Sequence, residues 1–278
     1  MVSESGICLQ SIVPVRSEAA HTAPMVTQVL FGELFRIIGK EKNWLNIQLI
    51  FDNYEGWIPE LQVHFISEPD FIRLKNAETF LTTSLVHPVI NKSDNSDIQI
   101  VAGSSLPGLK DNHMNIGPDT FYFDGSVTNG TVADDFTHPD RVTELRKHLI
   151  KYALKYLHTP YLWGGRTPFG IDCSGFTQMV YKLNQIKLFR DAKQQAEQGE
   201  MVPFLAEAET GDLAFFDDEN GAITHVGMLI DNRTVIHCSG SVHMDVIDHE
   251  GIYSNALKKY THRLRIIRRM VEIVTSGK

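Results

Sequence analysis

Basic residues and cysteines are both scarce in this chain of 278 residues. Its 26 Lys and Arg residues are outnumbered by 34 Asp and Glu residues, which gives a formal net charge of −8. Proteins that bind nucleic acid or anionic membranes rely on an excess of basic side chains, so neither is expected as a main partner. Three cysteines are too few, and an odd number, for a framework of disulfide bonds. We therefore expect free thiols in a reducing compartment.

Long apolar runs are also absent, and no stretch approaches the length of a membrane-spanning helix. The segment Met1–Gly6 contains no Lys or Arg, and the apolar segment from Ile7 to Val15 is interrupted by polar residues and a proline. Both features differ from a signal peptide. The sequence as printed predicts a cytoplasmic protein, or a periplasmic or secreted one if the native N-terminus was truncated.

The sequence does contain a cysteine in a position that suits a nucleophile. Cys173 follows a glycine-rich turn within residues 160–175, and the apolar spacing after it predicts that a helix begins there. The first turn of a helix presents unpaired N–H groups and a positive dipole end, which favour a thiolate and can hold an oxyanion. Asp172 then lies at the N-cap, where a carboxylate is a good acceptor.

Two histidines far downstream can complete an acyl-transfer site. His225 and His237 are each six residues from Asp231, so a hairpin centred near that residue would set them opposite each other. This geometry predicts that His225 acts as the base and that His237 holds its second ring nitrogen. An inert buried thiol, ordinary packing of the histidines and a zinc site of Cys173, His225 and His237 are the alternatives. Short-spaced ligand pairs are absent, so no metal or cofactor is expected.

Five short motifs connect these residues. They are, in chain order, Tyr-Leu-Trp-Gly-Gly, Asp-Cys-Ser-Gly-Phe, Gly-Asp-Leu-Ala-Phe-Phe, Thr-His-Val-Gly-Met and Val-Ile-His. Together they resemble the NlpC/P60 family of cell-wall cysteine peptidases, from about residue 140 to the C-terminus. The resemblance implies an α+β, papain-like catalytic domain, which fits the predicted order of helices followed by antiparallel strands. It also implies catalysis through a thioester, with Cys173, His225 and His237 as the triad.

The first half of the chain reads as short strands separated by turns. The segments Phe31-Gly32-Glu33 and Gly56-Trp57-Ile58 resemble a bacterial SH3 domain, a small β-barrel that often accompanies NlpC/P60 domains. A weaker pattern of short strands between residues 80 and 127 predicts a second SH3-like barrel. We expect an SH3 domain at 1–67, a second SH3-like β domain with its linker at 68–134, and the peptidase domain at 135–278.

The resemblance also implies a substrate. Peptidases of this architecture cleave the bond between γ-D-glutamate and a diamino acid in peptidoglycan stem peptides, L-Ala-γ-D-Glu-diamino acid, and select a free N-terminal L-Ala. The amine needs an acceptor and the substrate carboxylate needs donors. The candidate substrate-binding residues are Asp172, Ser174, Trp163, Tyr54, Glu33, Asp191 and Arg190. Ala192 stands where the family frequently has serine, so one hydroxyl contact is absent.

Two other functions stay open at this point. A non-catalytic protein that binds cell-wall peptides would use the same domains without turnover. An acyltransferase or amidase on the same fold would use the same thiol chemistry, because only the acceptor of the acyl group differs.

Overall fold

The computed structural model describes residues 4–128 and 139–271. The chain divides into an N-terminal unit, residues 1–130 with 163–168, and a C-terminal unit, residues 131–162 with 169–278. The predicted domain boundary between residues 134 and 135 falls outside the described residues. In the described part of the chain, no helix is long and apolar enough to cross a membrane.

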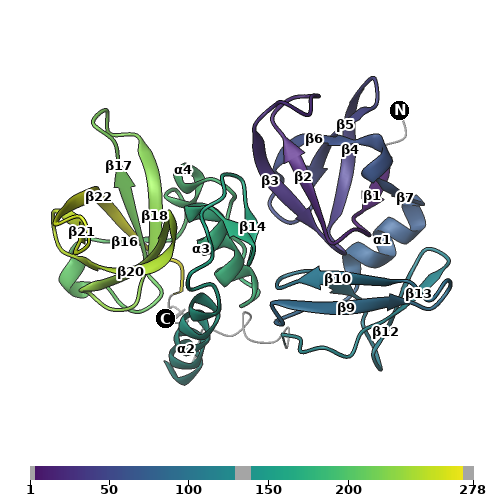
Figure 1. Ribbon diagram of the computed structural model, residues 1–278. Helices are drawn as coiled ribbons and strands as arrows, with labels where there is room; N and C mark the ends of the chain where they lie inside the picture. The colour runs from purple at the N-terminus through teal and green to yellow at the C-terminus, as the bar shows by residue number, and fades with distance from the viewer. Residues whose placement is uncertain (1–3, 129–138, 272–278) are drawn as a thin grey trace, which may run out of the picture. The chain divides into compact units, whose positions relative to one another are not determined.

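The N-terminal unit begins with a seven-stranded antiparallel sheet in the order β3-β2-β6-β5-β4-β1-β7 (Figure 1). Buried and partly buried residues alternate along β2 and β5, as expected for strands with one face on a core. This arrangement confirms the predicted β-rich region. The strands are β1 (Ser5–Ile7), β2 (Ile12–Arg16), β3 (Met25–Leu30), β4 (Leu34–Glu41), β5 (Trp44–Leu49), β6 (Glu55–Pro59) and β7 (His64–Ile66).

A helix, α1 (Glu68–Asn76), follows at the start of the region expected to hold a linker and a β domain. Ser67 accepts a hydrogen bond from the N–H of Asp70 at 3.2 Å, which caps the helix. Phe71 and Leu74, three residues apart, are both buried. The capping residue and this spacing are the sequence signals of the helix.

The rest of the N-terminal unit consists of two smaller sheets. One has four strands in the order β10-β9-β13-β12, and the other pairs β11 with β8. Ile7 of the first sheet and Phe31, in the turn after β3, share a core with Ile100 and Leu106, so the sheets fold as one unit. The described strands agree with the expected β content, while a second SH3-like barrel stays a prediction. The strands are β8 (Thr79–Leu81), β9 (Val86–Asn91), β10 (Asp97–Val101), β11 (Ser105–Pro107), β12 (His113–Ile116) and β13 (Asp119–Tyr122).

Residues 163–168 interrupt the sequence of the C-terminal unit and belong to the N-terminal one. The guanidinium of Arg166 donates to both carboxylate oxygens of Glu33 at 3.0 Å, and both side chains are buried. Gly164 has a φ of +74°, and a Cβ there would lie 2.7 Å from the carbonyl oxygen of Met25. A residue with a side chain would therefore clash as well as strain the backbone.

The C-terminal unit begins with helices. In α2 (Pro139–Lys155), Leu145, Leu149 and Ala153 are buried on one face, as the predicted periodicity requires. Every residue of α3 (Cys173–Lys182) is buried, so this helix lies inside the unit. Its predicted start at Cys173 is confirmed. The short elements β15 (Gly170–Ile171) and α4 (Ala192–Gln195) also belong to this unit, whereas β14 (Arg166–Thr167) belongs to the N-terminal unit.

The remaining strands form an antiparallel sheet in the order β16-β22-β17-β18-β19-β20-β21. Because β21 also pairs with β22, the sheet closes on itself. Helix α3 packs against β18 and β19, so helices and sheet form the expected α+β fold (Figure 1). The strands are β16 (Glu200–Val202), β17 (Leu213–Asp217), β18 (Ile223–Leu229), β19 (Thr234–Ser239), β20 (Ser241–Ile247), β21 (Gly251–Ser254) and β22 (Lys259–Arg269).

Candidate active site

Cys173 is the first residue of α3, and Asp172 is its N-cap. The carboxylate of Asp172 accepts a hydrogen bond from the N–H of Gly175 at 2.7 Å. The N–H of Cys173 has no acceptor within the helix, because the first four N–H groups of any α-helix lack one. A thiol and a backbone donor for an oxyanion therefore occupy the same residue.

Burial, with a smaller contribution from the negative charge of Asp172, raises the pKa of the Cys173 thiol to about 12. The N–H of Val226 and the charge of Arg190 act in the opposite direction without offsetting it. The helix N-terminus was expected to favour a thiolate, but burial dominates. This direction favours the protonated thiol over the thiolate, and a nucleophilic role for Cys173 would require a base to take its proton.

The two predicted histidines are in contact. His225 on β18 and His237 on β19 are buried, and Nε2 of His225 lies 2.9 Å from Nδ1 of His237. This hydrogen bond uses Nε2 of His225, so Nδ1 is the ring nitrogen that remains for a thiol proton. The contact between the two imidazoles is the one that the sequence predicted, and the role of His225 as a base stays a prediction.

The predicted register of this hairpin is wrong by two residues. His237 pairs with Gly227 rather than with His225, and the loop is centred on Asn232 because Ile230 N–H donates to the carbonyl of Thr234 at 2.9 Å. A shift of two keeps both histidines on the same face of the sheet. A Cβ on Gly227 would lie 2.9 Å from Cβ of His237, so the absence of a side chain makes room for the diagonal contact.

Burial keeps these imidazoles neutral. It lowers the pKa of His225 well below the ordinary 6.5, and the neighbouring imidazoles of His262 and His237 act in the same direction. Burial also lowers the pKa of His237 to about 3. A neutral imidazole carries the lone pair that a general base needs.

Three further residues surround the pair, and sequence reasoning missed them. His262 stacks on His225 with ring centroids 4.1 Å apart. His243 and Asp245 lie on β20, beside His237 of β19. His243 pairs directly with His237. The alternation of His243 and Asp245 along a strand was an available signal. His262 lies on the last strand, which begins at Lys259, and no sequence motif marks it.

Three of the predicted substrate-binding residues contact one another at the start of α3. Arg190 donates to both carboxylate oxygens of Asp172, at 3.0 and 2.6 Å, and to the hydroxyl of Ser174 at 3.0 Å. All three side chains are buried. They fix the geometry around Cys173, and their contact with substrate stays a prediction.

The other predicted substrate-binding residues are Glu33, Tyr54, Trp163 and Asp191. In the N-terminal unit, Glu33 accepts from Arg166 and from the N–H of Leu30 at 2.8 Å, and Tyr54 packs against the core of the first sheet. The side chain of Trp163 is exposed. Asp191 precedes α4 in the C-terminal unit. Their roles in binding also stay predictions.

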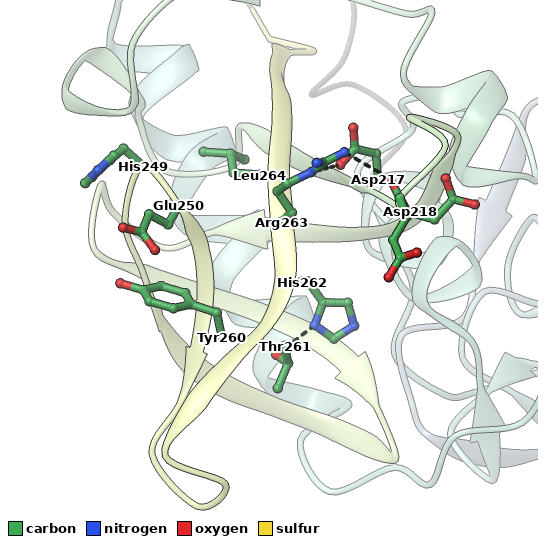
Figure 2. A pocket seen from close by; sticks show the side chains of 10 residues that line it. Asp217, Asp218, His249, Glu250, Tyr260, Thr261, His262, Arg263 and Leu264 are labelled. Atoms are coloured by element: carbon green, nitrogen blue, oxygen red, sulfur yellow. Dashed lines mark hydrogen bonds and ion pairs between the residues drawn. The ribbon is translucent and has the colours of Figure 1, made fainter.

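A pocket of about 740 Å³ lies in the C-terminal unit beside β22. Figure 2 shows Arg263 reaching to Asp217, an ion pair of 2.7 Å, and His262 at the wall of the pocket. The ring of His262 therefore belongs both to this pocket and to the stack on His225. The pocket is lined by Asp217, Asp218, Glu219, His249, Glu250, Tyr260, Thr261, His262, Arg263 and Leu264.

Comparison with known proteins supports two domain assignments. Residues 158–265 match the NlpC/P60 family, and residues 15–63 match the bacterial dipeptidyl-peptidase SH3 domain. A crystal structure of an NlpC/P60 family protein from Bacillus cereus has a TM-score of 0.79. That comparison covers 97% of this chain and 100% of the other, at 21% identity, and shows a common fold.

Curated relatives extend over most of the chain. The γ-D-glutamyl-L-lysine dipeptidyl-peptidases of Bacillus cereus and Bacillus subtilis are 27% and 29% identical over 76% of this chain. This chain covers 66% and 71% of their respective lengths. The dipeptidyl-peptidase 6 of Lysinibacillus sphaericus is 27% identical over 84% of this chain and 88% of its own length.

Proposed function

Because the chain contains an NlpC/P60 cysteine peptidase domain preceded by a bacterial SH3 domain, we propose that it hydrolyses the γ-D-glutamyl–diamino acid bond of peptidoglycan stem peptides. The observation that carries the proposal is the hydrogen bond between His225 and His237, on strands against which the helix of Cys173 packs. Two relatives named for the γ-D-glutamyl-L-lysine bond support this choice of bond.

In this mechanism the thiol proton is transferred during the attack. Nδ1 of His225 takes the proton as Sγ of Cys173 attacks the γ-glutamyl carbonyl carbon. The carbonyl oxygen becomes an oxyanion, to which the N–H of Cys173 donates a hydrogen bond. The raised pKa of the thiol and the lowered pKa of the imidazole both favour neutral groups before substrate arrives.

His237 stabilises the protonated imidazole of His225 that forms in this step. Its Nδ1 accepts from Nε2–H of His225, which fixes the ring and stabilises its positive charge. His225 then gives the proton to the leaving amine of the diamino acid, and the γ-glutamyl group stays on Cys173 as a thioester. Water activated by the same imidazole hydrolyses the thioester.

We propose further that the enzyme requires the free amine of the N-terminal L-Ala. The names of the relatives support this requirement, as does the match of residues 15–63 to an SH3 domain described for bacterial dipeptidyl-peptidases. A free amine is charged at neutral pH, and burying it unpaired is costly, so acetylation removes what such a site selects.

The test is mass spectrometry of products from L-Ala-γ-D-Glu-diamino acid and from the same peptide acetylated at its N-terminus. Cys173→Ala protein provides the blank. We expect cleavage of the free peptide alone. Equal cleavage of both peptides would remove the amine requirement and keep the peptidase.

Two other results would replace the proposal with the alternatives. Binding of the peptide without turnover, and without a thioester on Cys173, would identify a non-catalytic peptide-binding protein. Transfer of the dipeptide to an added amine in preference to water would identify an acyltransferase.

A further inference from the structure

His237 also belongs to a set of three side chains of the types that bind metal ions. His225 is not part of this set. The set consists of His237, His243 and Asp245, whose ligand atoms all lie within 4.8 Å of one another. His243 is opposite His237 on the neighbouring strand, and Asp245 follows two residues later on the same face. Two adjacent strands thus bring two imidazoles and a carboxylate to one place.

The distances within this set suit a metal ion better than hydrogen bonds. Oδ2 of Asp245 lies 3.4 Å from Nε2 of His237 and 3.2 Å from Nε2 of His243. Charge-assisted hydrogen bonds between such groups are shorter, about 2.8 Å. Ligand atoms bound tetrahedrally to Zn²⁺ at about 2.0–2.1 Å lie about 3.3 Å apart. Both observed distances match that separation.

The orientation of His243 points to the same conclusion. Its Nδ1 lies 2.7 Å from the carbonyl oxygen of Ser241, which can only accept, so Nδ1 carries the proton. Nε2 of the neutral ring then presents a lone pair to the carboxylate of Asp245. Two acceptors face each other there, and an added proton or a bound cation resolves the conflict. A hydrogen bond from the far nitrogen to a carbonyl is also how metal-binding histidines are held.

A second set, His225, His237 and His262, is equally compact but does not present converging lone pairs. The rings of His225 and His262 are stacked, with planes 26° apart, and imidazole lone pairs lie in the ring plane. The two lone pairs therefore run nearly side by side. Nε2 of His225 is also hydrogen-bonded to His237 at 2.9 Å.

We propose that His237, His243 and Asp245 form a Zn²⁺ site that switches off the peptidase. The side chains of His243 and Asp245 are 35% and 13% exposed, so an ion can enter from their side and keep a water as its fourth ligand. The inhibitory part rests on the proposed function, whereas the metal site does not.

Inhibition follows from the positions of two protons. In the proposed mechanism His237 accepts at Nδ1 and carries its proton on Nε2. Zn²⁺ on Nε2 moves that proton to Nδ1, which then donates to Nε2 of His225. The proton of His225 moves to its own Nδ1, so each ring keeps one proton. That Nδ1 can no longer accept the proton of Cys173.

The first experiment measures metal binding without activity. Co²⁺ is titrated into Cys173→Ala protein, which has no thiol at the site, and the visible absorption of tetrahedral Co²⁺ is recorded. We expect one equivalent to bind, and His243→Gln in this background to weaken binding at least about tenfold. Asp245→Asn provides a second ligand variant.

The matched control is His87→Gln. His87 also faces a carboxylate, that of Asp124 at 2.9 Å, but belongs to no three-ligand set among residues 4–128 and 139–271. Its replacement should leave Co²⁺ binding unchanged. Binding that survives both ligand variants, or that is absent from Cys173→Ala protein, would overturn the metal site.

The second experiment measures inhibition. Zn²⁺ should inhibit the protein that retains Cys173, and His243→Gln should keep metal-free turnover while losing at least about tenfold in sensitivity to Zn²⁺. Equal sensitivity of the two proteins would overturn the inhibitory role. A protein that binds Co²⁺ through His243 but cleaves no peptide would support the metal site and contradict the proposed function.

Discussion

The Cys173 thiol and the His225 imidazole are both buried, and burial disfavours the charged form of each. A cysteine at a helix N-terminus can form a stable thiolate, yet here the neighbouring Asp172 adds a negative charge that opposes it. In the proposed mechanism, catalysis then depends on proton transfer to His225 in the presence of substrate rather than on a preformed ion pair.

The reactivity of the thiol should depend on pH accordingly. With its pKa raised to about 12, Cys173 is protonated throughout the neutral range, so alkylation by iodoacetamide should accelerate with rising pH without levelling off near the ordinary value of 9.0. Mass spectrometry of the alkylated peptide measures the rate, with Cys173→Ser as the blank. A rate that is already constant at neutral pH would show a resting thiolate instead.

Two replacements of His237 should distinguish the effect of its hydrogen bond to His225 from the effect of its steric bulk. An asparagine can still accept from Nε2–H of His225, whereas an alanine cannot. We expect His237→Ala to lower kcat by about 10²-fold or more and His237→Asn to retain most of it, with KM little changed in both. His113→Ala, at an exposed histidine of the N-terminal unit, serves as the control. Equal losses in the two His237 variants would argue against the hydrogen bond.

At the scale of elements, the hairpin of β18 and β19 brings His225 and His237 together. The contact requires a residue with no side chain, Gly227. A Cβ at position 227 would lie 2.6 Å from Cγ2 of Val235 and 2.9 Å from Cβ of His237, both closer than real Cβ atoms come. Gly227→Ala should therefore displace His237 and lower kcat by about tenfold. Expressed as a free energy, this loss should exceed the loss in the free energy of unfolding. Steady-state kinetics and urea unfolding measure the two effects.

Gly39→Ala is the matched control for this prediction. Gly39 also lies within a strand, but its nearest neighbour would be Cβ of Asn46 at an ordinary 3.4 Å. This variant should keep both activity and stability. Normal kcat in Gly227→Ala would show that the sheet tolerates the methyl group and that the diagonal contact has more freedom than the structure indicates.

The elements that carry the motifs were predictable from the sequence, and their fine placement was not. The start of α3 at Cys173 follows from local signals, a glycine-rich turn and an Asp N-cap. The register of β18 and β19 depends on the three-residue loop centred on Asn232, which symmetry about Asp231 does not reveal. The stack of His262 on His225 joins strands distant in sequence, and burial of the thiol is a tertiary property.

At the scale of the whole molecule, the buried ion pair of Glu33 and Arg166 joins residues far apart in the sequence. Glu33→Gln would leave the guanidinium buried without its counter-charge, and we expect a loss of about 3–5 kcal/mol in the free energy of unfolding. Glu68→Gln, which breaks the partly exposed pair with Arg36, should cost much less, because solvent screens an ion pair at the surface. Thermal unfolding of both variants tests this difference, and equal losses would contradict it.

The division of the chain changes sides at residues 130/131, 162/163 and 168/169, so one cut does not separate the two folded units. A recombination that exchanged everything before residue 131 would keep Arg166 and discard Glu33, its counter-charge. The incoming domain would have to supply a buried carboxylate at the same place, together with room for the backbone at Gly164. An exchange of one half would therefore have to preserve these contacts, unlike an exchange of domains that are joined by a single linker.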